Sequence, residues 1–333
     1  MSSALDVGSL ILGIAILYWG AEWLIRGSAG IARALGVTPL VVGLTVVVYG
    51  TAAPELAVAT KTALAGHTPI ALGTVIGSCA ANIALVLGLA ALISPPTVDG
   101  RIIRREIPIL VGSAIAVPIL FRNGVLSRFE GMFLVGCAIV FTIGTVTVAA
   151  RLDLDDDLEQ LESAASSSSA MAAGAAAGGK ARPKTSRLLA LVMTICGLGL
   201  LVLGATLLVG GGRAIAQQLG MSERMLGLTI VALGTALPEL IRAVVAAARG
   251  QAAVAVGTVI GSNLLSVFLV LGVTACLQPI RLGERMHLVD LVGLVAITLL
   301  GVLVMRGSRR ITRFEGALLV LAYIAFLVAA AIL

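Results

Sequence analysis

The sequence predicts an all-α polytopic membrane protein with ten transmembrane helices, arranged as two inverted-topology repeats of five helices. Three observations lead to this prediction. The 333 residues are 59% hydrophobic and only 12% charged, whereas soluble domains carry about 25% charged residues. Several apolar runs reach roughly 20 residues, the length that crosses a bilayer core as a helix. The second half of the chain also repeats motifs of the first half.

The apolar segments follow one another in two groups of five. Helices are expected at residues 5–29, 37–64, 69–93, 103–121 and 126–149, and then at 187–209, 222–248, 252–276, 286–305 and 314–332. Between the groups, an acidic stretch at 151–163 leads into a tract rich in Ala, Ser and Gly. Such a tract cannot bury a core and is expected to be disordered. The predicted organisation is a first repeat at 1–150, a low-complexity linker at 151–186 and a second, inverted repeat at 187–333.

Four motifs recur in the same order in both groups. GLTVVVYGTAAPEL at 43–56 matches GLTIVALGTALPEL at 227–240, and GTVIGS recurs unchanged, 184 positions later in both cases. LVLG recurs at the same offset, and RFEG returns after 185 positions. Because five is odd, the second repeat must enter the membrane from the opposite side. This is the architecture of many secondary transporters.

Arginine positions predict the orientation, because cytoplasmic loops are enriched in basic residues. With the N-terminus outside, the linker is cytoplasmic, together with Arg26, Arg33, Arg101, Arg104, Arg105, Arg249, Arg306, Arg309, Arg310 and Arg313. A smaller group then lies outside: Arg122, Arg128, Arg213, Arg224, Arg281 and Arg285. The net charge of +6 is thus spread over loops without a basic face, which argues against nucleic-acid binding.

The repeated G-T-A-[AL]-P-E motif places a proline and an acid inside an apolar segment. Proline lacks an N–H and clashes with the carbonyl four residues earlier, so Pro54 and Pro238 are expected to break their helices. The carbonyls of Gly50 and Gly234 would then be free for a ligand. A carboxylate at that depth costs at least about 2.5–3.5 kcal/mol. Two such motifs at symmetric positions therefore favour a functional site over a structural kink.

The oxygen atoms expected around this site indicate the kind of ligand. The acids are Glu55 and Glu239. Hydroxyl and amide oxygens are expected from residues spaced four apart on one helix face. Together the candidate cation-binding residues are Glu55, Glu239, Thr51, Thr235, Ser78, Ser262, Asn82 and Ser266. An all-oxygen set suits hard cations such as Ca²⁺ or Na⁺, and no cofactor is expected beside the transported cations.

These motifs resemble the repeats of the cation/calcium antiporter superfamily, specifically its prokaryotic sodium/calcium exchangers. The resemblance spans all ten segments and is strongest at 43–93 and 227–277. It implies a secondary active antiporter that exchanges Na⁺ for Ca²⁺ by alternating access at a midplane site, in a prokaryotic inner (plasma) membrane. It also implies that Glu55 and Glu239 bind both ions, with Thr51, Thr235, Ser78, Asn82 and Ser262 contributing oxygens.

This chain departs from the family pattern at three ligand positions and near both acids. Ala52 and Ala236 replace the usual serines, and Ser266 replaces the usual Asp or Asn. Lys61 and Arg242 lie just beyond the acids and are candidate charge modulators. We interpret both as snorkelling toward an interface, with pairing of Arg242 to Glu239 as the alternative.

Other functions remain open at this point. An H⁺-coupled exchanger of Ca²⁺ or another cation is the nearest alternative, because the departures remove oxygen ligands and negative charge. A channel would need a continuous pore. An enzyme is not expected, because no nucleophile–base set is present and His67 and His287 fall at expected surface loops. The expected partners are inorganic cations and the lipid bilayer, and the oligomeric state is left open.

Overall fold

The computed structural model describes residues 2–34, 48–98, 100–151, 187–250, 252–282, 288–307 and 310–332, and it is mostly helical. Eight helical segments of this described part are long and apolar enough to cross a membrane. The linker at 152–186, the start of the segment at 37–64, and His287 lie outside the described residues.

The elements follow the predicted order, with short non-α turns inside several helices. The first half contains α1 (Ser2–Ala34), α3 (Val48–Thr51), α4 (Ala53–Leu64), α5 (Thr68–Ala80), the π-helical turn η2 (Ala81–Val86), α6 (Leu87–Ile93), α7 (Gly100–Leu120), the 3₁₀ turn η3 (Phe121–Asn123), β1 (Val125–Leu126) and α8 (Arg128–Arg151). The second half contains α10 (Arg187–Gln218), α11 (Glu223–Leu226), the π-helical turn η4 (Gly227–Val231), α12 (Ala232–Ala248), α13 (Ala252–Leu265), the π-helical turn η5 (Ser266–Leu271), α14 (Gly272–Leu277), β2 (Ile280–Arg281), α15 (Leu288–Gly307) and α16 (Arg313–Ile332).

The expected helix at 103–121 is present as α7 but is not among the eight apolar spans. Its first turns carry Arg101, Arg104, Arg105 and Glu106, and these charges lower the hydropathy of the helix. The segment at 37–64 is described only from Val48 onward, as α3 and α4. The described part therefore neither confirms nor contradicts the number of ten crossings.

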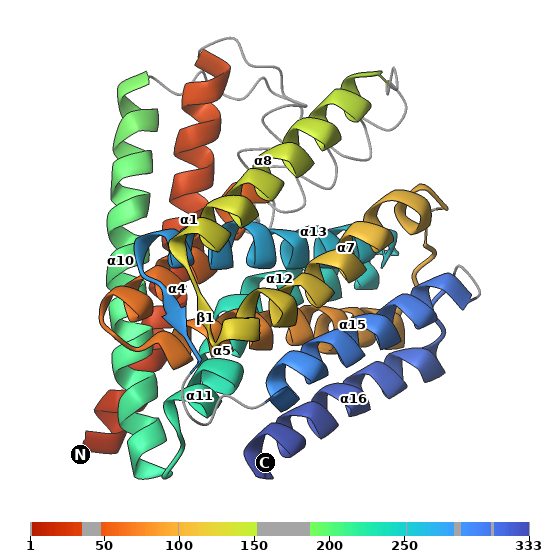
Figure 1. Ribbon diagram of the computed structural model, residues 1–333. Coiled ribbons are helices and arrows are strands. Elements are labelled where there is room, and N and C mark those ends of the chain that lie inside the picture. The colour runs from red at the N-terminus through yellow and green to blue at the C-terminus, as the bar shows by residue number, and fades with distance from the viewer. Residues whose placement is uncertain are drawn as a thin grey trace.

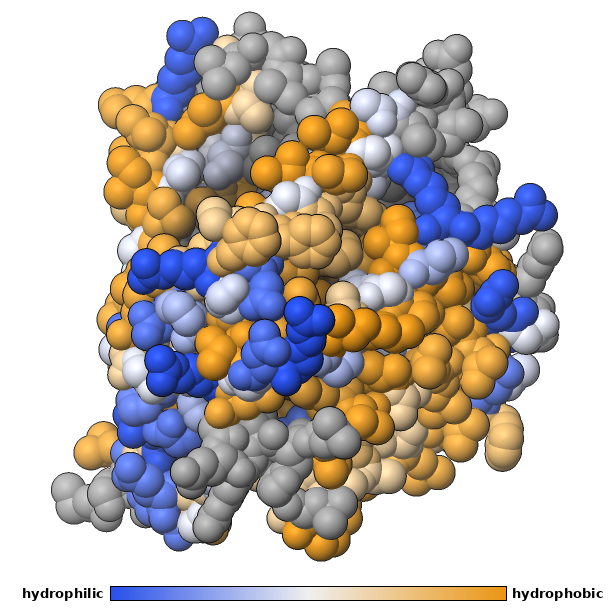
Figure 2. Space-filling view, in the orientation of Figure 1, coloured by the Kyte–Doolittle hydropathy of each residue, from blue (hydrophilic) through white to orange (hydrophobic). Residues whose placement is uncertain are grey.

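The middle of each half supplies the interior of the molecule. In its most apolar window, the α5–α6 span is 78% buried and the α13–α14 span is 72% buried, against 17% for α8. Large apolar side chains are exposed on the outer helices, among them Phe129, Val140, Leu188 and Ile332. Figure 2 shows this apolar surface covering much of the molecule. An exposed apolar surface of this extent is expected to face lipid.

Helices α1 and α10 form an antiparallel pair along one side of the molecule (Figure 1). At one end Arg187 donates to the Ala34 carbonyl at 3.4 Å, and at the other Gln218 donates to Asp6 at 2.9 Å. The seam between the helices contains glycines seven residues apart: Gly13, Gly20 and Gly27 on α1, and Gly197, Gly204 and Gly211 on α10. Small residues at such spacing let two membrane helices approach closely.

Replacing Gly204 by valine is expected to disrupt the α1–α10 pair. A Cβ at Gly204 would lie 2.7 Å from the Leu17 backbone nitrogen, so the two helices must separate. Forced overpacking costs about 1–3 kcal/mol, and we expect a clear fall in the thermal unfolding temperature.

The matched control is Gly199→Val, because Gly199 is exposed on the same helix and has open space around its Cβ position. Equal destabilisation by the two variants would contradict the glycine seam. Both measurements use the purified full chain in lipid nanodiscs.

The repeated RFEG motif has a structural explanation. Glu130 accepts from the Ser127 backbone N–H at 2.7 Å, and Glu315 accepts from the Thr312 backbone N–H at 2.7 Å. Both are capping boxes, which satisfy N–H groups at a helix start. The glycine that follows each glutamate then packs against a helix of the opposite half of the chain, Gly131 on Gly272 and Gly316 on Gly88. The motif therefore starts α8 and α16 and docks them onto α14 and α6.

Candidate cation-binding site

The two copies of the G-T-A-[AL]-P-E motif have different backbones. In the first, α3 ends at Thr51 and α4 begins at Ala53, so the helix is interrupted at Ala52, and Pro54 lies in the first turn of α4. In the second, Pro238 lies inside α12, which is continuous from Ala232 to Ala248.

The prediction that Pro238 breaks its helix is therefore wrong. The irregularity lies upstream, where η4 forms a π-helical turn at Gly227–Val231. Local π-helical adjustment is one way in which membrane helices tolerate proline. The Thr235 hydroxyl also bonds two carbonyls of this region, those of Val231 and Ala232, at 3.1 Å each.

The structure brings all eight candidate cation-binding side chains together around one cavity. Its lining consists of Thr51, Ala52, Glu55, Ser78, Asn82, Thr235, Ala236, Glu239, Ser262 and Ser266. Asn82 and Ser266 both lie at or near the start of a π-helical turn, in η2 and η5. Such turns occur often at functional sites. Gly50 and Gly234 do not line the cavity directly.

Glu55 is held by hydroxyl groups from both halves of the chain. The Ser78 hydroxyl donates to Oε1, and the Ser266 hydroxyl donates to Oε2 at 2.6 Å. The carboxylate is only 8% exposed. Ser266 stands at the position where the family pattern has an acid or amide, and in this chain it binds the glutamate of the opposite half.

Glu239 has a different environment, although it occupies the equivalent position. Its side chain is 6% exposed, and its Oε2 atom has no hydrogen-bond partner among the described residues. Within the same part of the chain, Asn82 Oδ1 in this cavity is also buried without a hydrogen-bond partner. An unsatisfied buried acceptor costs about 1–3 kcal/mol, and more if charged. Both oxygen atoms are therefore available to coordinate a cation.

Four of the five hydroxyl groups that line the cavity have already used their protons. Ser78 and Ser266 donate to Glu55, while Thr51 donates to the Val48 carbonyl at 2.8 Å. Thr235 donates to carbonyls of its own helix. A hydroxyl has one donor and two acceptor lone pairs, so these four groups present only lone pairs to a ligand. The cavity thus suits a cation and disfavours an anion.

Neither candidate charge modulator lines the cavity. The Lys61 ammonium group hydrogen-bonds the Thr206 hydroxyl on α10. Arg242 is half-buried, and within the described residues it forms no ion pair with Glu239. Neither basic side chain therefore lines the cavity, but the charge of Arg242 is close enough to act on Glu239.

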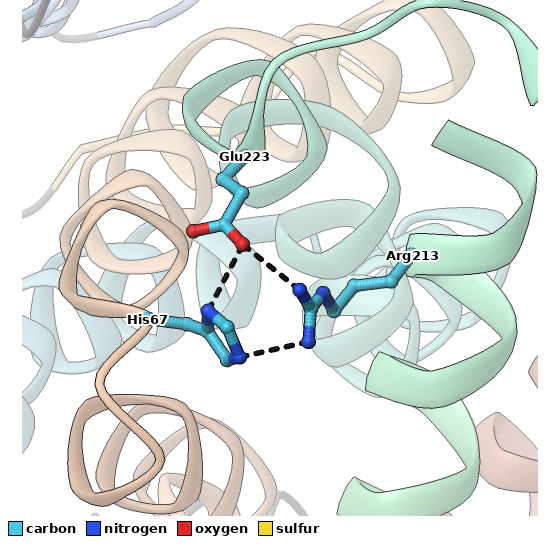
Figure 3. Close-up of polar contacts among 3 residues, drawn as sticks. All are labelled: His67, Arg213 and Glu223. Atoms are coloured by element: carbon cyan, nitrogen blue, oxygen red, sulfur yellow. Dashed lines mark hydrogen bonds and ion pairs between the residues drawn. The ribbon is translucent and has the colours of Figure 1, made fainter. Parts of the chain in front are cut away.

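Two features of this region were missed by sequence reasoning. Asn263, next to Ser262, donates through Nδ2 to the Cys79 carbonyl at 3.0 Å, which ties α13 to α5. The signal was present, because Cys79 and Asn263 are equivalent positions of the two repeats. His67 was expected to be a bland surface residue, but it contacts Arg213 and Glu223 (Figure 3).

The donor set of the cavity differs from that of a transition-metal site. Among the described residues, no group of three or more His, Cys, Asp or Glu side chains could hold a metal ion. Here the oxygens come from two carboxylates together with hydroxyls and an amide. A polytopic membrane protein with a buried cavity of oxygen acceptors is typical of an ion transporter.

Comparison with known proteins identifies the family. The family model for the sodium/calcium exchanger protein matches residues 5–147 and 189–332. The chain is 32% identical to a putative antiporter, CaxA, of Alkalimonas amylolytica, over 95% of this chain and 96% of that protein. It is 30% identical to the sodium/calcium exchanger MaX1 of Methanosarcina acetivorans, over 96% of each chain. The chain belongs to the sodium/calcium exchanger family.

A solved structure agrees with this assignment. The sodium-calcium exchanger NCX_Mj, soaked with Na⁺ and Ca²⁺, matches with a TM-score of 0.63 and 31% sequence identity, covering 98% of each chain. By name, the two curated relatives and this structural neighbour are exchangers or antiporters, that is, transporters. The prediction of a membrane protein of the sodium/calcium exchanger type is confirmed.

Proposed function

We propose that the chain exchanges Na⁺ for Ca²⁺ by alternating access, at one site formed by Glu55 and Glu239 with the oxygens around them. The observation that carries this proposal is the cavity itself, in which both repeats contribute a buried carboxylate and acceptor oxygens to one lining. Two carboxylates balance the charge of one Ca²⁺ or of two Na⁺. An empty site would leave two like charges buried together, which is costly, so the protein would cross between its states with ions bound.

We further propose ten membrane crossings in two inverted five-helix repeats, divided at 1–150, 151–186 and 187–333. Contacts between loops support this topology. Val125 of β1 pairs with Arg281 of β2, and Thr97 pairs with Arg310. In the proposed topology the first pair lies outside and the second lies in the cytoplasm. Shifts of 184 and 185 residues convert one pair of positions into the other.

The same topology gives the orientation and the moving part. We propose that the N-terminus lies outside, that the linker is cytoplasmic and that the membrane is the prokaryotic inner membrane. The α1–α10 pair contacts the rest of the molecule along one side and is the candidate gate that slides over the other helices. Its glycine seam joins α1 and α10 closely enough for the two to move as one body.

A flux measurement in sealed vesicles tests the proposed function. Ca²⁺ uptake into Na⁺-loaded vesicles is expected to require an outward Na⁺ gradient and to stop when choline replaces Na⁺. Uptake that follows a pH gradient and ignores Na⁺ would establish H⁺ coupling and overturn Na⁺ exchange. The names of the relatives favour Na⁺ as the coupling ion.

A further inference from the structure

A cluster of three polar side chains joins the C-terminal end of α10 to the α4–α5 turn and to α11 (Figure 3). His67 lies in the turn between α4 and α5, Arg213 is near the end of α10, and Glu223 is in the first turn of α11. His67 Nδ1 lies 2.9 Å from Glu223 Oε1, and Arg213 Nη1 lies 2.7 Å from His67 Nε2. Arg213 Nη2 is also 3.2 Å from Glu223 Oε1.

These distances fix the protonation state of the imidazole in this arrangement. An arginine side chain can only donate hydrogen bonds, so His67 Nε2 must be the acceptor from Arg213. The Nδ1 atom then carries the ring proton and donates it to Glu223. His67 is therefore neutral here, and Glu223 is shared between His67 and Arg213.

Adding a proton to His67 changes this balance. The new proton would lie on Nε2, facing the N–H of Arg213, so the hydrogen bond is lost and two cations face each other. The charged imidazole would also hold Glu223 more strongly, since hydrogen bonds between charged groups are the stronger ones. Glu223 is thereby drawn away from Arg213 on α10 and toward His67 in the α4–α5 turn. Histidine is the side chain that ordinarily changes charge between pH 5 and 8.

The other charged groups on neighbouring elements have their own partners or face elsewhere. On α4, Lys61 bonds Thr206. On α11, Arg224 faces Asp290 and the Ala330 carbonyl. On β2, Arg281 is exposed. On α1, Asp6 accepts from Gln218. Within the described residues, Arg213 and Glu223 are thus the charged side chains that bond to the His67 ring.

The cluster has no counterpart at the equivalent positions of the other half of the chain. A shift of 184 residues takes His67 to Gln251, Arg213 to Ala29 and Glu223 to Pro39. Alanine and proline side chains can form neither a hydrogen bond nor an ion pair. The same three-residue contact therefore cannot form at the opposite end of the molecule, although inverted repeats exchange the roles of α1 and α10 between the two access states.

We propose that His67, Arg213 and Glu223 form a proton-sensitive latch that ties α10 to the α4–α5 turn. Acidification on the side of the membrane that these residues face opens the latch. The inference rests on the proposed function in one respect, that the α1–α10 pair moves against the other helices. Opening the latch then favours the access state in which α10 has moved, so pH on this side sets the balance of the two states.

The test is amide hydrogen exchange of the full chain in lipid nanodiscs at pH 8 and pH 6, corrected for the intrinsic pH dependence of exchange. In the wild type, protection of the end of α10 from Arg213 onward is expected to fall about fivefold at pH 6, the worth of one hydrogen bond. In His67→Gln, which keeps an acceptor and a donor but does not titrate, protection should not depend on pH. An equal fall in His67→Gln, or no fall in the wild type, would overturn the latch.

Arg213→Gln provides a second, independent variant if His67→Gln folds poorly. It removes the cation on α10, so protection of the end of α10 should already be low at pH 8 and should fall no further at pH 6. A wild-type pH response in this variant would also overturn the latch. Exchange protection does not depend on transport, so a chain that shows the pH response but no Na⁺-driven Ca²⁺ flux would count against the proposed function alone.

Discussion

Replacing Glu239 by glutamine is expected to abolish Ca²⁺ exchange while raising the thermal stability of the ion-free protein. In the part of the chain that the structure describes, the Oε2 atom of Glu239 is buried without a hydrogen-bond partner. Removing one of two charged ligands to a buried cation costs about 2–5 kcal/mol, which is a loss of at least about thirtyfold in ion affinity. The same change removes a buried unsatisfied charge, so the ion-free protein should gain about 1–3 kcal/mol.

The measurements are Ca²⁺ flux in vesicles and unfolding temperature with and without Ca²⁺. In the wild type, Ca²⁺ should raise the unfolding temperature, because a ligand that binds only the folded state stabilises it. This increase should be lost in Glu239→Gln. Glu315→Gln is the control, since Glu315 caps α16 and does not line the cavity. Normal Ca²⁺ flux through Glu239→Gln would refute the proposed site.

Glu55→Gln is expected to lose transport as well, but with little gain in ion-free stability. Both oxygens of Glu55 already accept hydrogen bonds, from Ser78 and Ser266. The carboxylate therefore has hydrogen-bond partners before a cation binds. Removing its charge lowers the free energy of the ion-free protein by less than removing the charge of Glu239. Equal gains in stability for the two variants would contradict this difference between the acids.

Restoring the family pattern at three positions is expected to steepen the dependence of Ca²⁺ flux on Na⁺. In the wild type, three Na⁺ ions against two carboxylates would leave a net charge of +1 in a buried cavity, which is unfavourable. We expect the wild type to couple fewer Na⁺ ions per Ca²⁺ than three, or to bind Na⁺ weakly. Ala52→Ser, Ala236→Ser and Ser266→Asp together add two hydroxyls and one carboxylate to the lining.

Ser266→Asp should dominate this effect, because Ser266 Oγ lies 2.6 Å from Glu55 Oε2. An aspartate there faces the glutamate directly, and two carboxylates at that separation need a cation or a proton between them. Ser266→Asn is the matched control, of similar size but without the charge. Ca²⁺ flux is measured against Na⁺ concentration for all variants. A wild type with three-ion dependence that the triple variant leaves unchanged would refute the charge argument.

The sequence determined the membrane class and most of the cavity lining, because both depend on local patterns. Length and hydropathy of the apolar runs predict membrane helices without reference to contacts. The repeat offset paired Glu55 with Glu239 and Ser78 with Ser262, and the four-residue spacing placed Asn82 and Ser266 on the same faces. All eight candidate cation-binding side chains line the cavity for these reasons.

Only the tertiary structure decided how the two acids differ and how α10 is tied to the core. Ser266 donates to Glu55, 211 positions away in the chain, while Glu239 Oε2 has no hydrogen-bond partner in the described ranges. Arg213 reaches His67 across 146 positions. The first motif interrupts its helix and the second does not, although their sequences are nearly the same. Such differences arise from the packing of distant segments, and the repeat pattern, which makes the two halves look equivalent, carries no information about them.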